Sequence, residues 1–169
     1  MTAISPPPSR IYLLRHADSS PALPGERDFD RALSDKGFAQ AEIIADKAAD
    51  KGYRPDLVIS STALRTRQTT EAFKRALSAT AEIRYVDALY SGPQSTYIEI
   101  LAAQTDIGSV ALVGHNPFIS QALETLIGHA AVQKALSNGY PTAGFAVLDP
   151  IQSADGATTN WVLSDFLSE

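Results

Sequence analysis

The stretch IYLLRH at residues 11–16 decides the fold, because a short apolar run ends there on an arginine and a histidine. Such a run is typical of a strand that is buried on both faces of a parallel sheet. Two further runs have the same form, LVISS at residues 57–61 and VALVGH at residues 110–115. Three buried strands of this kind indicate an open α/β sheet, in which ligands bind at the carboxyl edge.

Helical patterns separate these runs. Ser34 is predicted to cap a helix that ends near Lys51, with Gly52 as its stop. Alternating strands and helices imply right-handed crossovers, so we expect a three-layer αβα sandwich around a mainly parallel sheet of about six strands. The other predicted elements are strands near residues 83–86, 145–148 and 160–163 and helices near residues 96–104 and 130–136.

Composition bounds the function. The chain of 169 residues is predicted to form a single domain at residues 10–169 after a disordered, proline-rich tail at residues 1–9. Its net charge of -5 argues against nucleic acid as a partner, and the lack of cysteine excludes disulfides and thiolate metal sites. No apolar run approaches the ~18 residues that cross a membrane, and no secretory signal is visible, so we expect a cytoplasmic protein.

Arg65 is the most informative single position. It falls in the first turn of a helix that Ser61 or Thr62 is predicted to cap, where the helix dipole disfavours a cation by ~0.3–1 kcal/mol. A bound anion reverses the sign of that cost, and so does a nearby Asp or Glu. Arg67 points elsewhere on the same helix and is predicted to be a solvated surface residue.

His115 is predicted to lie just before a helix with Asn116 as its cap and Pro117 at the first helical position. The free N–H groups of such a helix end bind anions. Arg15, beside His16, presents a planar fork that can hold two phosphate oxygens. The strand ends therefore predict a phosphoryl pocket, with one neutral imidazole as the nucleophile and the other protonated. The residues alone leave open which histidine attacks, and the third, His129, is predicted to lie on the surface.

Three ordered motifs resemble those of the histidine phosphatase superfamily, which is phosphoglycerate mutase-like: LRHA at residues 14–17, STALRTRQT at residues 61–69 and VGHNP at residues 113–117. The segment DRALS at residues 30–34 and the following Gly37 to Ala41 look like the SixA-type phosphohistidine phosphatase branch. The resemblance implies that His16 becomes phosphorylated, that Arg15, Arg65 and His115 hold the phosphate with Asn116 beside them, and that neither a cofactor nor a metal takes part.

The sequence departs from the superfamily at two places. Ala17 stands where most members have glycine, and no carboxylate stands where ester-cleaving relatives carry their general acid. Asp18 and Asp87 are candidate substitutes. A general acid accelerates the departure of a poor leaving group by ~10²- to 10⁴-fold, whereas a protonated imidazole leaves with little help. The absence of a general acid therefore favours phosphohistidine on a signalling protein as the substrate. The short segment between Asp87 and Val110 leaves no room for a large cap, which suits a protein substrate.

Three alternatives remain open at this point. The first is a phosphatase of the same superfamily that cleaves small phosphate esters, with Asp18 or Asp87 as the acid. The second is a module that binds phosphate without turnover. The third is a metallohydrolase built on His16, Asp18 and His115, although this spacing matches no strong ligand pattern.

Overall fold

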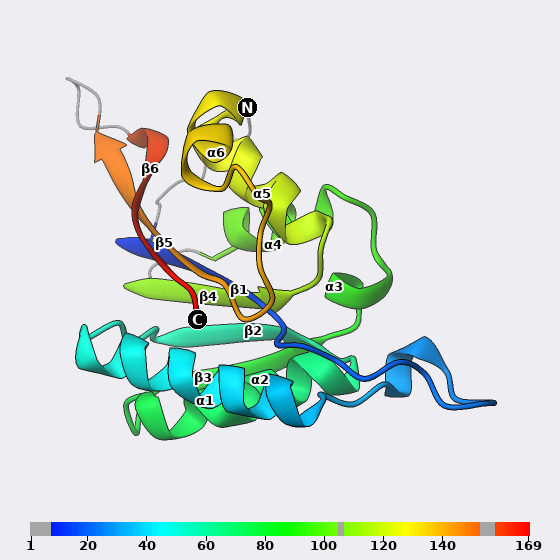
Figure 1. The fold of residues 1–169 in the computed structure, drawn as a ribbon. Coiled ribbons are helices and arrows are strands. Elements are labelled where there is room, and N and C mark those ends of the chain that lie inside the picture. The colour runs from blue at the N-terminus through cyan, green and yellow to red at the C-terminus, as the bar shows by residue number, and fades with distance from the viewer. Residues whose placement is uncertain (1–7, 105–106, 153–157) are drawn as a thin grey trace.

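The computed structural model describes residues 8–104, 107–152 and 158–169. They contain a six-stranded sheet with the order β3-β2-β4-β1-β5-β6 (Figure 1). The first four strands in this order are parallel, whereas β5 is antiparallel to β1 and β6 is antiparallel to β5. All six predicted strands are confirmed: β1 Arg10–Arg15, β2 Leu57–Ser61, β3 Glu82–Val86, β4 Ser109–Gly114, β5 Phe145–Gln152 and β6 Thr158–Leu167.

Helices cover both faces of the sheet, which confirms the three-layer prediction. In Figure 1, α1 and α2 lie on one face and α4, α5 and α6 lie on the other. Side chains of β1 alternate between the layers: Tyr12 and Leu14 pack in the cluster under α1, and Ile11 and Leu13 pack in the cluster under α5. The helices are α1 Asp35–Asp50, α2 Leu64–Phe73, α3 Ala88–Ser91, α4 Thr96–Ala102, α5 Phe118–Ile127 and α6 His129–Ala135, with 3-10 turns η1 Asp28–Asp30 and η2 Lys74–Ala76.

The chain enters β1 through a short segment that is hydrogen-bonded to the residue before the neighbouring strand β4. Of the tail predicted at residues 1–9, residues 1–7 lie outside the described part, and the N–H of Ser9 already donates to the carbonyl of Gly108. No helix among the described residues is both long enough and apolar enough to cross a membrane.

One of the three predicted helix caps is confirmed. The Oγ of Ser34 accepts from the N–H of Gly37 at 3.0 Å, as expected. The cap predicted for α2 at Ser61 or Thr62 is wrong, because the N-cap is Ala63. Ser61 still belongs to β2, and the Oγ1 of Thr62 donates to Asp87 and accepts no hydrogen bond from the N–H groups at the start of the helix.

The cap predicted for α5 is also wrong. The helix begins at Phe118, so Pro117 is the N-cap and not the first helical residue. Asn116 provides no side-chain cap, and among the described residues its buried Oδ1 has no hydrogen-bond partner. The helix instead takes its first bond from the carbonyl of His115, which accepts from the N–H of Ile119 at 2.8 Å.

Candidate active site

A pocket of about 360 Å³ lies at the carboxyl edge of β1, β2 and β4. Arg15 and His16 reach it from the end of β1, Arg65 from the first turn of α2, and His115 from the end of β4. The structure thus brings together the four side chains that the strand ends predicted to converge. The remaining lining residues are Asp18, Ser19, Arg31, Asn116 and Thr142.

His16 is held in one tautomer. Its Nδ1 lies 2.7 Å from the carbonyl oxygen of Ala17, and because a carbonyl can only accept, Nδ1 carries the proton. The Nε2 atom is therefore left with its lone pair. The ring is only 8% exposed, and its backbone N–H donates to the carbonyl of Gly114 at 3.0 Å. A buried imidazole with a fixed, unprotonated Nε2 is suited to nucleophilic attack.

His115 faces His16 across the pocket, with ring centroids 5.3 Å apart. Its Nε2 lies 2.8 Å from the Oγ of the fully buried Ser61, and its backbone N–H donates to the hydroxyl of Tyr97 at 2.9 Å. Gly114 makes the second contact possible, because a side chain there would collide with the Tyr97 ring. The His115 ring is therefore fixed from both its side chain and its backbone.

Both imidazoles have lowered pKa values. Burial is the main cause for His16 and lowers its pKa to about 4; the bond to Ala17 opposes this shift, and the charges of Arg65 and Arg15 add to it. Burial, with His16 and Arg65 nearby, lowers the pKa of His115 to about 3. Both rings are neutral near pH 7 in the protein alone, whereas the predicted protonation of one of them concerns the pocket with a phosphoryl group bound and stays a prediction. The arginines supply the positive charge.

Arg65 is anchored by Asp28 of η1. Its Nη1 donates to the Asp28 carbonyl at 2.8 Å, and its Nη2 donates to the Asp28 carboxylate at 3.0 Å. Arg31 and Tyr90 also donate to this carboxylate, at 3.0 and 2.9 Å. Partial burial alone would raise the pKa of Asp28, but these hydrogen bonds hold it at about 2. Arg65 thus both lines the pocket and pairs with a carboxylate. Its position in the first turn of the helix predicts either a bound anion or a nearby Asp or Glu.

Arg31 is a third pocket arginine that sequence reasoning missed. Its Nε donates to the carbonyl of Ser20 at 2.9 Å, and its Nη2 donates to the Oγ of Ser19 at 2.8 Å. These bonds fold the segment between β1 and α1 back toward the pocket, although Figure 1 shows the tip of this segment projecting past the sheet. The available signal was an arginine inside a long charged loop, which by itself does not distinguish a site from a solvated surface.

Arg15 is fixed by the opposite wall of the pocket. Its Nη1 donates to the carbonyl of Tyr140 at 2.6 Å, and the Tyr140 hydroxyl donates to the carbonyl of Leu13 at 2.6 Å. Burial lowers the pKa of Arg15, but an arginine remains charged under all ordinary conditions. Its other N–H groups can hold an anion.

The two candidate proton donors differ in position. Asp18 lines the pocket, and its Oδ2 accepts from the Oγ of Ser34 at 2.6 Å. Asp87 is exposed, does not line the pocket and accepts from the Oγ1 of Thr62 at 2.6 Å. Asn116 lines the pocket as predicted. Of the two carboxylates, Asp18 is therefore the one placed to act on a bound substrate.

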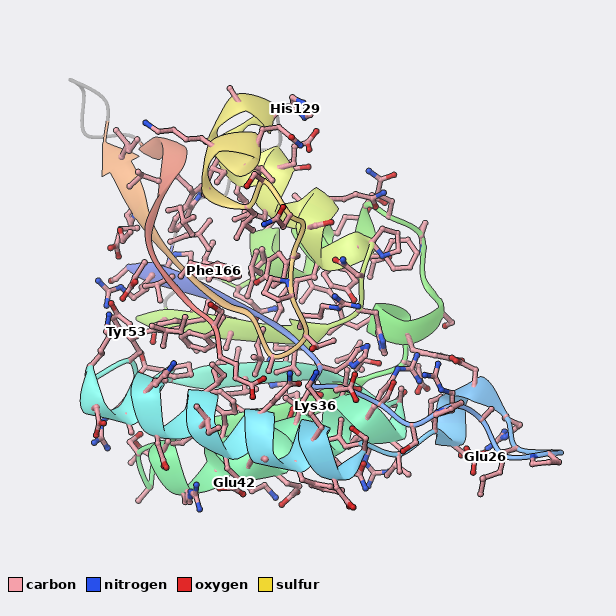
Figure 2. The ribbon with its side chains drawn as sticks, viewed as in Figure 1. Glu26, Lys36, Glu42, Tyr53, His129 and Phe166 are labelled. Atoms are coloured by element: carbon pink, nitrogen blue, oxygen red, sulfur yellow. The ribbon has the colours of Figure 1, made fainter. Side chains whose placement is uncertain are left out.

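The two residues predicted to lie on the surface do so. Arg67 is exposed, with its guanidinium 5.6 Å from the centre of the Tyr85 ring. His129 is exposed at the start of α6 (Figure 2). Its Nδ1 lies 3.2 Å from the carboxylate of Glu124. The described residues also contain no group of three His, Cys, Asp or Glu side chains placed to hold a metal ion, so their arrangement does not support the metallohydrolase alternative.

The chain is similar to members of one known protein family. A family model described as the histidine phosphatase superfamily (branch 1) matches residues 11–90. A solved structure described as a candidate phosphohistidine phosphatase, SixA, from Agrobacterium tumefaciens is 52% identical, with a TM-score of 0.87, over 96% of this chain and 99% of its own. The corresponding SixA structure from Nakamurella multipartitia is 29% identical, with a TM-score of 0.68, over 95% and 97%. A chloroplastic protein of Arabidopsis thaliana is 31% identical over 83% of this chain and 72% of its own length.

Proposed function

The chain belongs to the histidine phosphatase superfamily, and on that premise we propose that it removes the phosphoryl group from phosphohistidine on a signalling protein. The observation that carries the proposal is the His16 tautomer. Its Nδ1–H is engaged by Ala17, so Nε2 is the nitrogen that attacks phosphorus. The 52% identical SixA relative supports phosphohistidine as the substrate class.

The proposed reaction has two transfers. In the first, the Nε2 of His16 forms a bond to phosphorus while the bond to the leaving nitrogen of the substrate breaks. In the second, water attacks phosphorus and breaks the Nε2–P bond, which releases inorganic phosphate and restores the neutral imidazole. Arg15 and Arg65 stabilise the negative charge on the phosphoryl oxygens in both steps.

His115 and Asn116 complete the proposed phosphate site. The neutral imidazole of His115 can donate one hydrogen bond to a phosphoryl oxygen. Negative charge bound beside the ring raises its pKa and favours the protonated form, which strengthens that bond. Asn116 is a further donor through its amide group.

A second candidate function is hydrolysis of small phosphate esters. The observation that favours it is Asp18, a carboxyl group in the wall of the pocket, since an alkoxide leaving group needs a proton. The Oδ2 of Asp18 already accepts a hydrogen bond from Ser34 at 2.6 Å, which engages one of the two carboxyl oxygens away from a leaving group. We therefore rank phosphohistidine first and phosphate esters second.

The proposed function is tested by measuring phosphate release from two substrates that have different leaving groups. A protein phosphorylated on histidine by phosphoramidate should be dephosphorylated about 10²-fold or more faster, in kcat/KM, than an alkyl phosphate. Equal rates, or faster ester cleavage, would select the second candidate. Binding of phosphate with no release from either substrate would select a module without turnover.

Two further parts of the proposal have their own tests. We propose that the reaction needs no metal ion, so activity should be unchanged after dialysis against EDTA, and a loss restored by a divalent cation would contradict this. We also propose a cytoplasmic location, which a fluorescent fusion of the full chain would check.

A further inference from the structure

The backbone of Ala17, the residue after the nucleophile, is held from two helices. Its N–H donates to the Oγ1 of Thr69 in α2 at 3.0 Å. The next peptide unit, which contains the Ala17 carbonyl and the Asp18 N–H, is held by α1, because that N–H donates to the Oε1 of Gln40 at 3.0 Å. The Ala17 carbonyl is also the acceptor for the Nδ1–H of His16. Two side chains remote from the pocket opening therefore fix the group that sets the His16 tautomer.

Thr69 connects the nucleophile to the arginine that faces it. Its Oγ1 accepts from Ala17 and donates to the carbonyl of Arg65 at 2.8 Å, so its single hydroxyl serves both backbones. Thr69 and Ala17 are both fully buried. No water can replace this hydroxyl without a rearrangement, because the site is closed on all sides. The contact also fixes the register between the first turn of α2 and the end of β1.

Gln40 belongs to an equally constrained environment. It is 4% exposed, and its Nε2 donates to the carboxylate of Glu169 at 2.8 Å, which fixes which end of the amide faces Asp18. Gly37, one turn earlier in α1, lies so close to the Asp18 carbonyl that a side chain there would collide with it. The helix therefore approaches residues 17–18 at backbone distance.

We propose that Thr69 and Gln40 are positioning residues for the proposed reaction, holding Ala17 so that His16 presents an unprotonated Nε2 to phosphorus. The expected effect on kcat rests on the proposed function, whereas the expected effect on the His16 tautomer does not. Without the hydroxyl of Thr69 or the amide oxygen of Gln40, the Ala17 carbonyl is freed to turn, and the imidazole proton can move between the two nitrogens. A fraction of His16 then carries the proton on the attacking atom.

The test compares Thr69→Val with Thr69→Ser and with Thr70→Val. Thr70 is a matched control, because it is also fully buried in α2 but donates to the carbonyl of Thr66 and contacts Ser60. We expect Thr69→Val to lower kcat by about 10- to 100-fold with little change in KM, since misplacement of a reacting group costs about that much. Thr69→Ser should restore most of kcat, and Thr70→Val should keep it. Gln40→Met should behave like Thr69→Val.

The decisive readout is the tautomer, measured without substrate by ¹⁵N NMR of the His16 ring. The wild-type protein should show Nδ1 protonated and Nε2 unprotonated near pH 7, whereas Thr69→Val and Gln40→Met should show a mixture. A single unchanged tautomer in both variants would overturn the inference, as would equal losses in Thr69→Val and Thr70→Val. If Thr69→Val fails to fold, the His16 tautomer in Gln40→Met decides whether the inference holds. Because this readout needs no turnover, it stays valid if the proposed phosphatase activity is not found.

Discussion

The Nη2 of Arg65 lies 3.0 Å from the Oδ2 of Asp28, although the two residues are 37 positions apart in the chain. The guanidinium is buried and its partner is half exposed, so Asp28 orients an arginine that would otherwise be free to turn within the pocket. Through this pairing, the segment between β1 and α1 contributes to the proposed phosphate site and does not merely connect the two elements.

Asp28→Asn should weaken phosphate binding. The amide keeps the size of the side chain but loses the charge that orients Arg65 and Arg31, so we expect the inhibition constant for inorganic phosphate to rise by about 3- to 10-fold. Asp30→Asn is the matched control, because Asp30 lies in the same 3-10 turn and, within the part of the chain that the structure describes, forms its ion pair with the exposed Arg27 alone. Equal effects of the two substitutions on phosphate inhibition would contradict the role given to Asp28.

Arg65→Lys should lower kcat/KM far more than Arg67→Lys does. A lysine keeps the charge but cannot bind Asp28 and a phosphoryl group with a planar fork, so kcat/KM should fall by about 10²-fold. Arg67 lies two positions further along α2 on the exposed side, and its replacement should change kcat/KM by less than about twofold. Steady-state kinetics on a phosphohistidine protein measure both. A large loss in Arg67→Lys would place the phosphate elsewhere.

The pH dependence of kcat/KM should report an unusually acidic histidine. His16 must be neutral to attack, and burial lowers its pKa to about 4, so activity should hold as the pH falls through 6.5 and drop only near pH 4. Asp28, with a pKa of about 2, stays ionised over this range. A pH profile on one substrate, corrected for its own ionisation, provides the measurement. An apparent pKa near 6.5 would contradict the burial of the nucleophile.

The same lowered pKa values predict a loss of stability in acid. In the unfolded chain His16 and His115 take up protons near pH 6.5, whereas in the folded protein they do so only near pH 4 and pH 3. The unfolded state therefore binds more protons between these values, and the free energy of unfolding should fall as the pH is lowered from about 6.5 toward 4. Urea unfolding at several pH values measures this. His16→Ala should show a weaker dependence than the wild-type protein.

Asp18→Asn and Asp87→Asn should differ in their rates on an alkyl phosphate but not on phosphoramidate. Asp18 lines the pocket and Asp87 does not, so only Asp18→Asn should slow hydrolysis of an alkyl phosphate, by about 10-fold or more. With phosphoramidate, whose leaving group needs little help, both variants should stay within about threefold of the wild type. A selective loss in Asp87→Asn on the alkyl ester would reverse the assignment.

The sequence predicted much of this architecture because the strongest signals are local. Apolar runs that end on Arg15, His16 and His115 define strands whose carboxyl ends must share one edge of a parallel sheet, so the convergence of these residues follows from topology alone. The helix that begins after Ser34 was predicted for the same reason, since its capping side chain lies three residues from its partner. Periodicity and capping chemistry act over short distances and can be read from the chain.

Contacts between distant segments could not be predicted in this way. Nothing near Arg65 in the sequence indicates that Asp28 binds it, and Arg31 gives no sign that it faces the pocket until the loop is folded. The capping error at Ser61 has a related origin, because the Oγ of Ser61 lies 2.8 Å from the Nε2 of His115, 54 positions away, and its local bond is to the N–H of Ala63 before the helix begins. A distant partner of this kind cannot be read from the residues near Ser61 in the chain.

The most direct test of the account is to trap the phosphorylated enzyme. The protein is mixed with ³²P-labelled phosphoramidate, quenched in alkali on the millisecond scale, digested and analysed by mass spectrometry. The account predicts an acid-labile phosphoryl group on the Nε2 of His16, formed and lost at the rate of turnover and absent in His16→Ala. Phosphate on His115, or turnover by the wild-type protein without any phosphorylated histidine, would contradict it.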